Sequence, residues 1–459
     1  MALPLVALSM DVNGIGTVLP AIARSLDIDW ARANLVVSAS TVAFAVALLP
    51  AGYATYRWGH RSLLLLGVSA LGLASLLCAV APGLGVLAVG RALQGAAGAF
   101  CFTTSLAVVA AGFEEARRPA AIGAWGAISG VGAAAGPLVG GALVDLVSWR
   151  AFFVVTGGLA LVSLPALWVL VGRRPSPSAS EVSGASGAAP AAPWRWARLV
   201  ALSAGLVLAI GATGLVARDG WASATVAVTG AAGLALLGLV LWSGRRPGTA
   251  PLVRPTVRRA PLFGATGVAA FASTWGFGVT VVYAAVYLQD VRGYSALGAG
   301  GVFAVYCALF ALAGTVVGPL VRRIGPARTL APAMAVGTVG LAALALLGTS
   351  TPPAVVVVAL AVAGAGQGLC FDTTSVTALS GVEVASAGEA SAVAQAFRLI
   401  GFSLGVTVSA SVATRAALGL GTGVSAQYRA AMVVAATASL LGTAGAAVLA
   451  RRADRRIVG

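Results

Sequence analysis

Four charged side chains lie inside long apolar runs of this 459-residue chain, where a charge is costly and is by default a candidate for function. They are Asp11, Arg91, Asp372 and Arg398. A carboxylate in such a run exchanges a proton or pairs with a cation, and an arginine there needs a partner. Asp11 and Arg91 are therefore candidate functional residues. The alternatives are that Asp11 reaches water at a helix end and that the two residues form a structural ion pair without turnover.

Asp372 and Arg398 leave several interpretations open. Asp372 could bind a cationic substrate or a second proton, or it could cap the cytoplasmic end of its helix. Arg398 and Glu389 could line a site, although a charge near the boundary of an apolar run is the commoner case. Trp275 is a further candidate for the wall of a substrate site, and core packing is its ordinary role.

Glycines recur through residues 123–141, in a run that also contains a proline. The residues are Gly123, Gly132, Gly136, Pro137, Gly140 and Gly141. Three of the glycines are four residues apart, so on a helix they share one face and form a groove without side chains. Such a groove lets a neighbouring membrane helix approach closely, and the proline bends the helix. The alternative is a generic packing helix, because the chain contains 60 glycines.

The composition is that of an integral membrane protein built from helices. Apolar residues make up 59% of the chain and charged residues 9%, with a mean hydropathy of +0.97, whereas soluble proteins carry about 25% charged residues. The net charge is +16, and all of the positively charged residues are arginines, which lie in short clusters between apolar runs. This pattern excludes a nucleic-acid stripe. The cysteines lie in apolar runs and predict buried packing residues, and the single histidine, His60, excludes a histidine-rich metal site.

Helices must position these residues, and fourteen apolar runs are long enough to be expected as spans. They cover about 3–23, 33–55, 62–81, 84–111, the glycine-rich run ending at Asp145, the run from Trp149, 199–217, 222–243, 262–288, 298–320, 329–349, 353–379, 390–413 and 428–450. The expected organisation is 1–173 as an N-terminal six-helix bundle, 174–198 as a cytoplasmic linker, 199–243 as an extra helix pair, 244–261 as a second linker, 262–450 as a C-terminal bundle and 451–459 as a cytoplasmic tail.

The arginines predict the orientation of the chain. With both termini in the cytoplasm, 20 of the 29 arginines fall in cytoplasmic segments and seven in outer segments, while Arg91 and Arg398 remain in the membrane. Cytoplasmic loops carry such an excess of positive charge. Merging the pair of runs at 199–243 into one span would make the count odd and remove the bias, so an even number of spans is favoured.

Several of these motifs resemble the major facilitator superfamily, and the resemblance covers nearly the whole chain. The glycine run is similar to the fifth-helix antiporter motif of its drug:proton antiporters. Asp11, nine residues before Pro20, is similar to the first-helix signature of the fourteen-span members. Arg91 lies in a segment similar to the fourth-helix motif, where the family's arginine is tied to proton coupling. The resemblance implies that Asp11 and Arg91 are the proton-coupling residues. Two halves of the chain also echo each other, as in transporters whose site lies between repeats.

The turn between the second and third runs resembles the superfamily's gating loop. Gly52, Arg57, Gly59 and Arg61 match its pattern, but Tyr56 stands where the family has an aspartate. The resemblance implies a latch of the inner gate, and the loss of the acid implies altered gating or a substitute hydrogen bond from Tyr56. The alternative is a tight basic cytoplasmic turn.

The resemblance implies an all-α integral membrane protein with the major facilitator fold, comprising two six-helix bundles and two extra central helices. The expected function is export of a hydrophobic or amphiphilic drug or antibiotic in exchange for protons. Uptake by symport, a membrane enzyme and a non-transporting sensor are the alternatives. The expected partners are the bilayer, a small-molecule substrate and protons. We expect a monomer in a bacterial plasma membrane. We expect no cofactor, because no ATP-binding loop occurs and there is no lysine to complete one.

Overall fold

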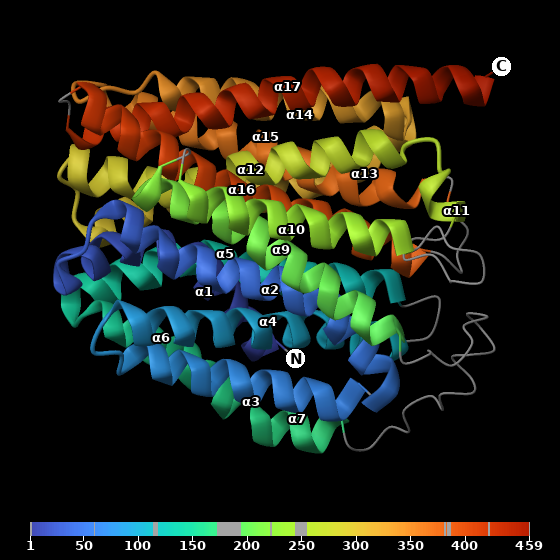
Figure 1. Ribbon diagram of the computed structural model, residues 1–459, viewed down its shortest axis with the longest axis horizontal. Helices are drawn as coiled ribbons and strands as arrows, with labels where there is room; N and C mark the ends of the chain where they lie inside the picture. Colours follow the sequence, from blue (N-terminus) through green and yellow to red (C-terminus); the bar gives the residue numbers. More distant parts are fainter. Residues whose placement is uncertain are drawn as a thin grey trace. The chain divides into compact units, whose positions relative to one another are not determined.

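The chain folds into helices in the computed structural model, which describes residues 2–58, 60–112, 118–171, 194–220, 223–243, 255–380, 382, 387–420 and 423–458. Figure 1 labels the elements in chain order. They are α1 Ala2–Leu26, α2 Trp30–Trp58, α3 His60–Ala79, α4 Leu84–Gly112, α5 Arg118–Leu146, α6 Trp149–Val162, α7 Leu164–Val171, α9 Trp194–Asp219, α10 Ala224–Ser243, α11 Pro255–Arg258, α12 Phe263–Val286, the π-helix η1 Tyr287–Val291, α13 Ala296–Ile324, α14 Pro326–Ala345, α15 Pro353–Leu379, α16 Ala387–Leu420 and α17 Val424–Val458.

The lengths and composition of these helices confirm a multi-pass membrane protein. Eleven of the described helices are long and apolar enough to cross a bilayer. Three shorter apolar helices, at Arg32–Leu48, Val200–Ala209 and Ala224–Val240, fall within further runs that were expected to be spans. The all-helical class predicted from composition is therefore confirmed, and the count of fourteen spans stays a prediction.

Two expected boundaries differ from the structure. Helix α9 begins at Trp194, so the last part of the linker expected at 174–198 is helical. Helix α17 continues to Val458, so most of the tail expected at 451–459 is also helical (Figure 1). Both segments carry arginines that are strong helix formers, and the first also has tryptophans suited to a membrane interface. The expected boundaries were taken from the ends of the apolar runs, which indicate the edge of the hydrocarbon layer and not the end of the helix.

The chain divides into two compact units. Unit 1 comprises Met1–Gly211, Val228–Val240 and Ser295–Gly300, and unit 2 comprises Ala212–Ala227, Leu241–Tyr294 and Gly301–Gly459. The extra helix pair expected at 199–243 is therefore shared between the two units. In unit 1, the Ser203 hydroxyl on α9 donates a hydrogen bond to the Val46 carbonyl on α2 at 3.0 Å.

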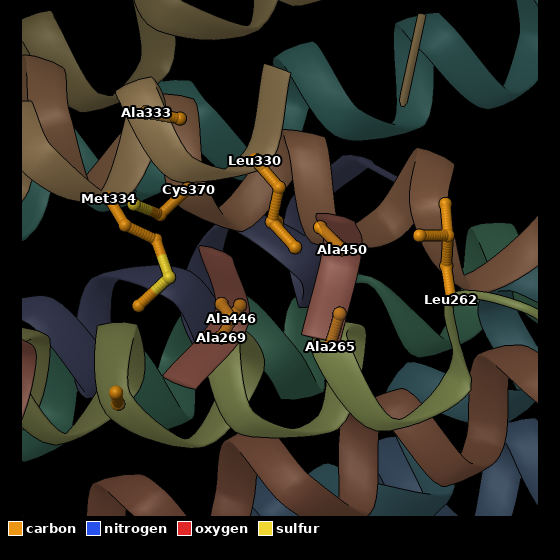
Figure 2. Packing of buried hydrophobic residues seen from close by; sticks show 10 residues of the cluster. Leu262, Ala265, Ala269, Leu330, Ala333, Met334, Cys370, Ala446 and Ala450 are labelled. Carbon is orange, nitrogen blue, oxygen red and sulfur yellow. The ribbon is translucent and has the colours of Figure 1, made fainter. Parts of the chain in front are cut away.

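The core of unit 2 contains many small side chains (Figure 2). Alanines of α12, α14 and α17 meet there, with Leu330, Met334 and Cys370 filling the remaining space. Lipid tails are as apolar as these side chains, so close packing rather than hydrophobic burial holds such helices together. The cysteines Cys78, Cys101, Cys307 and Cys370 are all buried and free, which agrees with the packing role predicted for them.

The C-terminal end of α5 caps the first turn of α13 within unit 1. Asp145 accepts hydrogen bonds from the backbone N–H groups of Ala296 at 3.1 Å and of Leu297 at 2.8 Å, one to each carboxylate oxygen. These N–H groups belong to the first turn of a helix and have no partner within it. A carboxylate there also interacts favourably with the positive end of the helix dipole.

We expect Asp145→Ala to lower the free energy of unfolding by about 1 kcal/mol, since loss of a helix cap has that typical cost. Thermal unfolding in detergent would measure it, followed with a thiol-reactive dye that reports exposure of the buried cysteines. Asp145→Asn, which keeps one acceptor oxygen, should lose less. Equal stability of the wild type and Asp145→Ala would contradict the capping role.

Candidate functional site

A buried ion pair joins α1 to α4 in unit 1. Arg91 Nη1 lies 2.7 Å from both carboxylate oxygens of Asp11. The Arg91 side chain is 1% exposed and that of Asp11 is 4% exposed. Asp11 lies in the middle of α1 and not at its end, so the interpretation that it reaches water at a helix terminus is wrong. The two residues singled out by their charge in apolar runs are in direct contact.

Gln94 completes the carboxylate side of this site. It lies one turn after Arg91 on α4, a spacing that places both side chains on one helix face. Its carbonyl oxygen accepts a hydrogen bond from Arg91 Nη1 at 2.6 Å, and its amide nitrogen donates to Asp11 Oδ1 at 3.0 Å. The same nitrogen donates to the Ser75 hydroxyl on α3 at 2.8 Å. Gln94 therefore links the ion pair to a third helix.

The other guanidinium nitrogens of Arg91 bind to α2. Nε donates to the carbonyl of Val36 at 3.0 Å, and Nη2 donates to the Ser40 hydroxyl at 3.0 Å. The guanidinium carbon is also 5.8 Å from the ring centroid of Phe153 on α6. Every nitrogen of this buried guanidinium thus has an oxygen acceptor, which is what a buried arginine requires.

Gln94, Ser40 and Ser75 were not predicted as site residues. Gln94 had a usable signal, because it is a polar residue three positions after a buried arginine in an apolar run. The serines had none, since serine is common in membrane helices and contacts between helices that are distant in sequence are set by the fold.

The glycines of α5 face α1 and bring the two backbones together. A Cβ added at Gly132 would lie 2.8 Å from the Val6 carbonyl oxygen, and one at Gly136 would lie 2.6 Å from the Met10 carbonyl oxygen. Gly14 of α1 faces back toward α5, where an added Cβ would lie 2.7 Å from the Gly136 carbonyl oxygen. We call these contacts the α1–α5 seam. It fixes the backbone on either side of Asp11.

The remaining residues of the glycine run have different surroundings. A Cβ added at Gly140 would lie 3.1 Å from a methyl carbon of Val18. Gly141 faces the first turn of α13, where an added Cβ would overlap the Ala296 backbone, and Pro137 lies inside α5. Gly123 is also within α5, but its surroundings lie outside the described residues.

The expected gating turn is only partly described. Helix α2 continues to Trp58 and includes Gly52, Tyr56 and Arg57. The surroundings of these three residues are outside the part of the chain that the structure describes, and Gly59 is outside it entirely. Arg61 on α3 is described. Its guanidinium lies 4.6 Å from the ring centroid of Trp168 on α7, and Nη2 donates to the Trp168 carbonyl at 3.4 Å. The contact joins α3 to α7 at this end of unit 1.

A second buried arginine lies in unit 2. Arg398 is 6% exposed and lies on α16, five residues inside the apolar span Val393–Thr414. Nη2 donates to the Phe371 carbonyl and to the hydroxyls of Thr374 and Ser375, each at 2.7 Å. Nη1 donates to Gln395 Oε1 at 2.7 Å, and the guanidinium carbon lies 3.9 Å from the Phe371 ring centroid.

Asp372 and Trp275 also lie in unit 2. Asp372 is half-buried on α15, seven residues before the helix ends at Leu379, so it does not cap that helix end. The Trp275 ring lies 5.6 Å from that of Phe271 on α12. Its buried indole Nε1 has no acceptor among the described residues. If Trp275 lines a substrate site, as expected, it offers that site an apolar ring and an N–H donor.

No group of three metal-ligating side chains occurs in the part of the chain that the structure describes. The described chemistry consists of carboxylates, arginines, hydroxyls and amides within packed helices. Such groups bind protons and polar ligand groups.

Comparisons with known proteins identify the family of this chain. The family model described as Major Facilitator Superfamily matches residues 2–201 and 197–406. The chain is 30% identical over 416 residues to the multidrug resistance protein Stp of Mycobacterium tuberculosis, covering 88% of this chain and 73% of that protein. It is 31% identical over 423 residues to the cephamycin export protein CmcT of Amycolatopsis lactamdurans, covering 88% of this chain and 81% of that protein. The solved structure of the POT family transporter PepTSo matches with a TM-score of 0.72 at 14% identity, covering 99% of this chain and 97% of that one.

Proposed function

This chain belongs to the Major Facilitator Superfamily of membrane transporters, and from that premise we propose that it exports a hydrophobic or amphiphilic small molecule in exchange for protons. Relatives that are about 30% identical over most of the chain are a multidrug resistance protein, a drug efflux pump and an antibiotic export protein. The chain is a transporter and not an enzyme. We take the substrate class from these relatives and the proton coupling from the geometry of unit 1.

The Asp11–Arg91 ion pair is the observation that carries the proposal. A proton on Asp11 removes the counter-charge of Arg91, and a buried arginine without its carboxylate is costly. Conformations in which Arg91 reaches water or other acceptors then become favoured. Because the pair spans α1 and α4 and Gln94 ties it to α3, the change in charge acts on several helices together. A proton binding from outside would thereby favour the return of the empty carrier, and its release inside would reset the cycle.

The remaining parts of the proposal concern topology. We propose fourteen spans, with both termini in the cytoplasm of a bacterium and the chain acting as a monomer. The eleven long apolar helices and the three shorter ones support the span count. The excess of arginine in the segments assigned to the cytoplasm supports the orientation. Uptake by symport is the second candidate, and the glycine-packed α5 favours antiport over it through its similarity to the antiporter motif.

The direct test uses energised inside-out vesicles, with the internal acidity recorded while lipophilic cations, dyes and antibiotics are added. For wild-type protein we expect one or more compounds to cause proton efflux. Asp11→Asn should abolish this efflux, because the amide keeps one acceptor for Arg91 but cannot take up and release a proton as a carboxylate does.

Asp27→Asn is the matched control. Asp27 lies just after α1 and is exposed, with a positive φ of 50° that asparagine also adopts. We expect its proton efflux to equal that of the wild type. Unchanged proton efflux in Asp11→Asn would show that this residue does not couple protons to transport. Accumulation of the same compounds in energised right-side-out vesicles would establish symport instead of antiport.

A further inference from the structure

Asp372 carries a carboxylate that nothing in the described structure neutralises. No described side chain donates a hydrogen bond to it or lies within ion-pair distance of it, although it is half-buried in α15 inside an apolar span. Asp11, in contrast, has both oxygens bound by Arg91. An unpaired carboxylate in such a position is a candidate for binding a proton or a cation.

The nearest charged group does not serve as the counter-charge by contact. Arg398 binds the carbonyl of Phe371 and the hydroxyls of Thr374 and Ser375, which precede and follow Asp372 on α15. The Phe371 ring covers its guanidinium. Of the described charged and titratable groups, Arg398 is the one that acts on Asp372 through space. The arginine is held by neutral oxygens, which leaves the carboxylate free.

The opposite helix provides space for this carboxylate. A Cβ added at Gly314 of α13 would lie 2.8 Å from Asp372 Oδ2, so any larger residue at position 314 would displace the carboxylate. The ring of Phe310, one turn before Gly314, lies 5.7 Å from that of Phe371. The side of the site toward α13 is therefore made of glycine and aromatic surface, which suits a neutral carboxyl group better than a charged one.

We propose that Asp372 is a second proton-binding site, located in unit 2 and separate from the Asp11–Arg91 pair in unit 1. A proton adds to one carboxylate oxygen and leaves a neutral carboxylic acid against Gly314. Its release restores the carboxylate, with Arg398 as the charge nearby. The transport cycle would then carry a proton on each of two carboxylates, and this part of the inference rests on the proposed antiport function.

Infrared difference spectroscopy tests the site without any transport. Lowering the pH of the purified full-length protein in detergent should produce the C=O stretching band of a protonated carboxyl group. We expect Asp372→Asn to remove one titrating component that Asp11→Asn retains. Gly314→Ala should shift the frequency or the midpoint of that component. Gly301→Ala on the same helix should not, because an added Cβ there has no neighbour within 4 Å. A titrating spectrum unchanged in Asp372→Asn would overturn the proposal.

Transport separates a proton site from a site for a positively charged substrate. With an uncharged substrate, we expect Asp372→Asn to move fewer protons per molecule than the wild type while its transport continues. Loss of cationic substrates alone, with the proton ratio for uncharged ones unchanged, would overturn the proposal in favour of a substrate site. Absence of substrate-linked proton flux in the wild type would refute the antiport function, whereas the infrared result would still decide whether Asp372 binds a proton.

Discussion

Arg91→Met is expected to destabilise the protein by about 3–5 kcal/mol, the usual cost of removing one partner from a buried ion pair. The substitution keeps the volume of the side chain but leaves the Asp11 carboxylate, Gln94 and Ser40 without their shared donor. Transport should be lost as well. Thermal unfolding in detergent, reported by exposure of the buried cysteines, measures the loss of stability.

The double variant Asp11→Asn/Arg91→Met separates the pair from general damage. Removing both charges leaves no uncompensated ion, so it should recover much of the stability that Arg91→Met loses. Arg150→Met is the matched control, because Arg150 stacks on Trp149 and donates one hydrogen bond, to the Ala81 carbonyl at 3.0 Å. Strictly additive effects of the two substitutions at Asp11 and Arg91 would show that they do not act as a pair.

Gly136→Ala is expected to cost about 1–3 kcal/mol, as overpacking of a close contact does, and to impair transport. The added methyl group would lie 2.6 Å from the Met10 carbonyl oxygen and 2.8 Å from the Gly14 nitrogen. Backbone atoms cannot move aside as a flexible side chain can, so α1 must shift relative to α5. Asp11 follows Met10 directly, and its contact with Arg91 shifts with it. Thermal unfolding and proton efflux would record the two effects.

Two other glycines calibrate this result. Gly158→Ala on α6 adds a methyl group with no neighbour within 4 Å, so it should leave stability equal or slightly higher, since alanine favours helix. Gly140→Ala meets a methyl group of Val18 at 3.1 Å and should have an intermediate effect. If Gly136→Ala were as stable and active as Gly158→Ala, the α1–α5 seam would not position the ion pair.

The residues of the ion pair could be predicted from the sequence, but their contact could not be derived from it. A charge in an apolar run can be recognised from the sequence alone, and this is why Asp11 and Arg91 were predicted as site residues. Val36 and Ser40, which bind Arg91, lie on α2, and Ser75, which binds Gln94, lies on α3. No local pattern gives the rotation of one helix against another. The spacing of Gly132 and Gly136 predicted a close helix contact, yet it did not say that α1 is the neighbour.

The sequence left the charged residues of unit 2 undecided, because it gave only their position along the chain. Arg398 was expected near a span boundary, because arginines usually are. The apolar span of α16 begins at Val393, so Arg398 lies five residues inside it, where hydroxyls of α15 bind the guanidinium. Asp372 was not distinguished from a helix-end residue for the same reason. Apolar runs locate the hydrocarbon layer, while helices extend beyond it by an amount that composition does not fix.

The α1–α5 seam has a consequence for how such a protein changes over evolutionary time. Because main-chain atoms of Val6, Met10 and Gly14 meet glycines of α5, the place of Asp11 depends on backbone contact. Side chains on other helix faces are then expected to be exchanged without moving Asp11. Substitutions at the seam glycines, in contrast, are expected to move Asp11 and therefore to be tolerated less often.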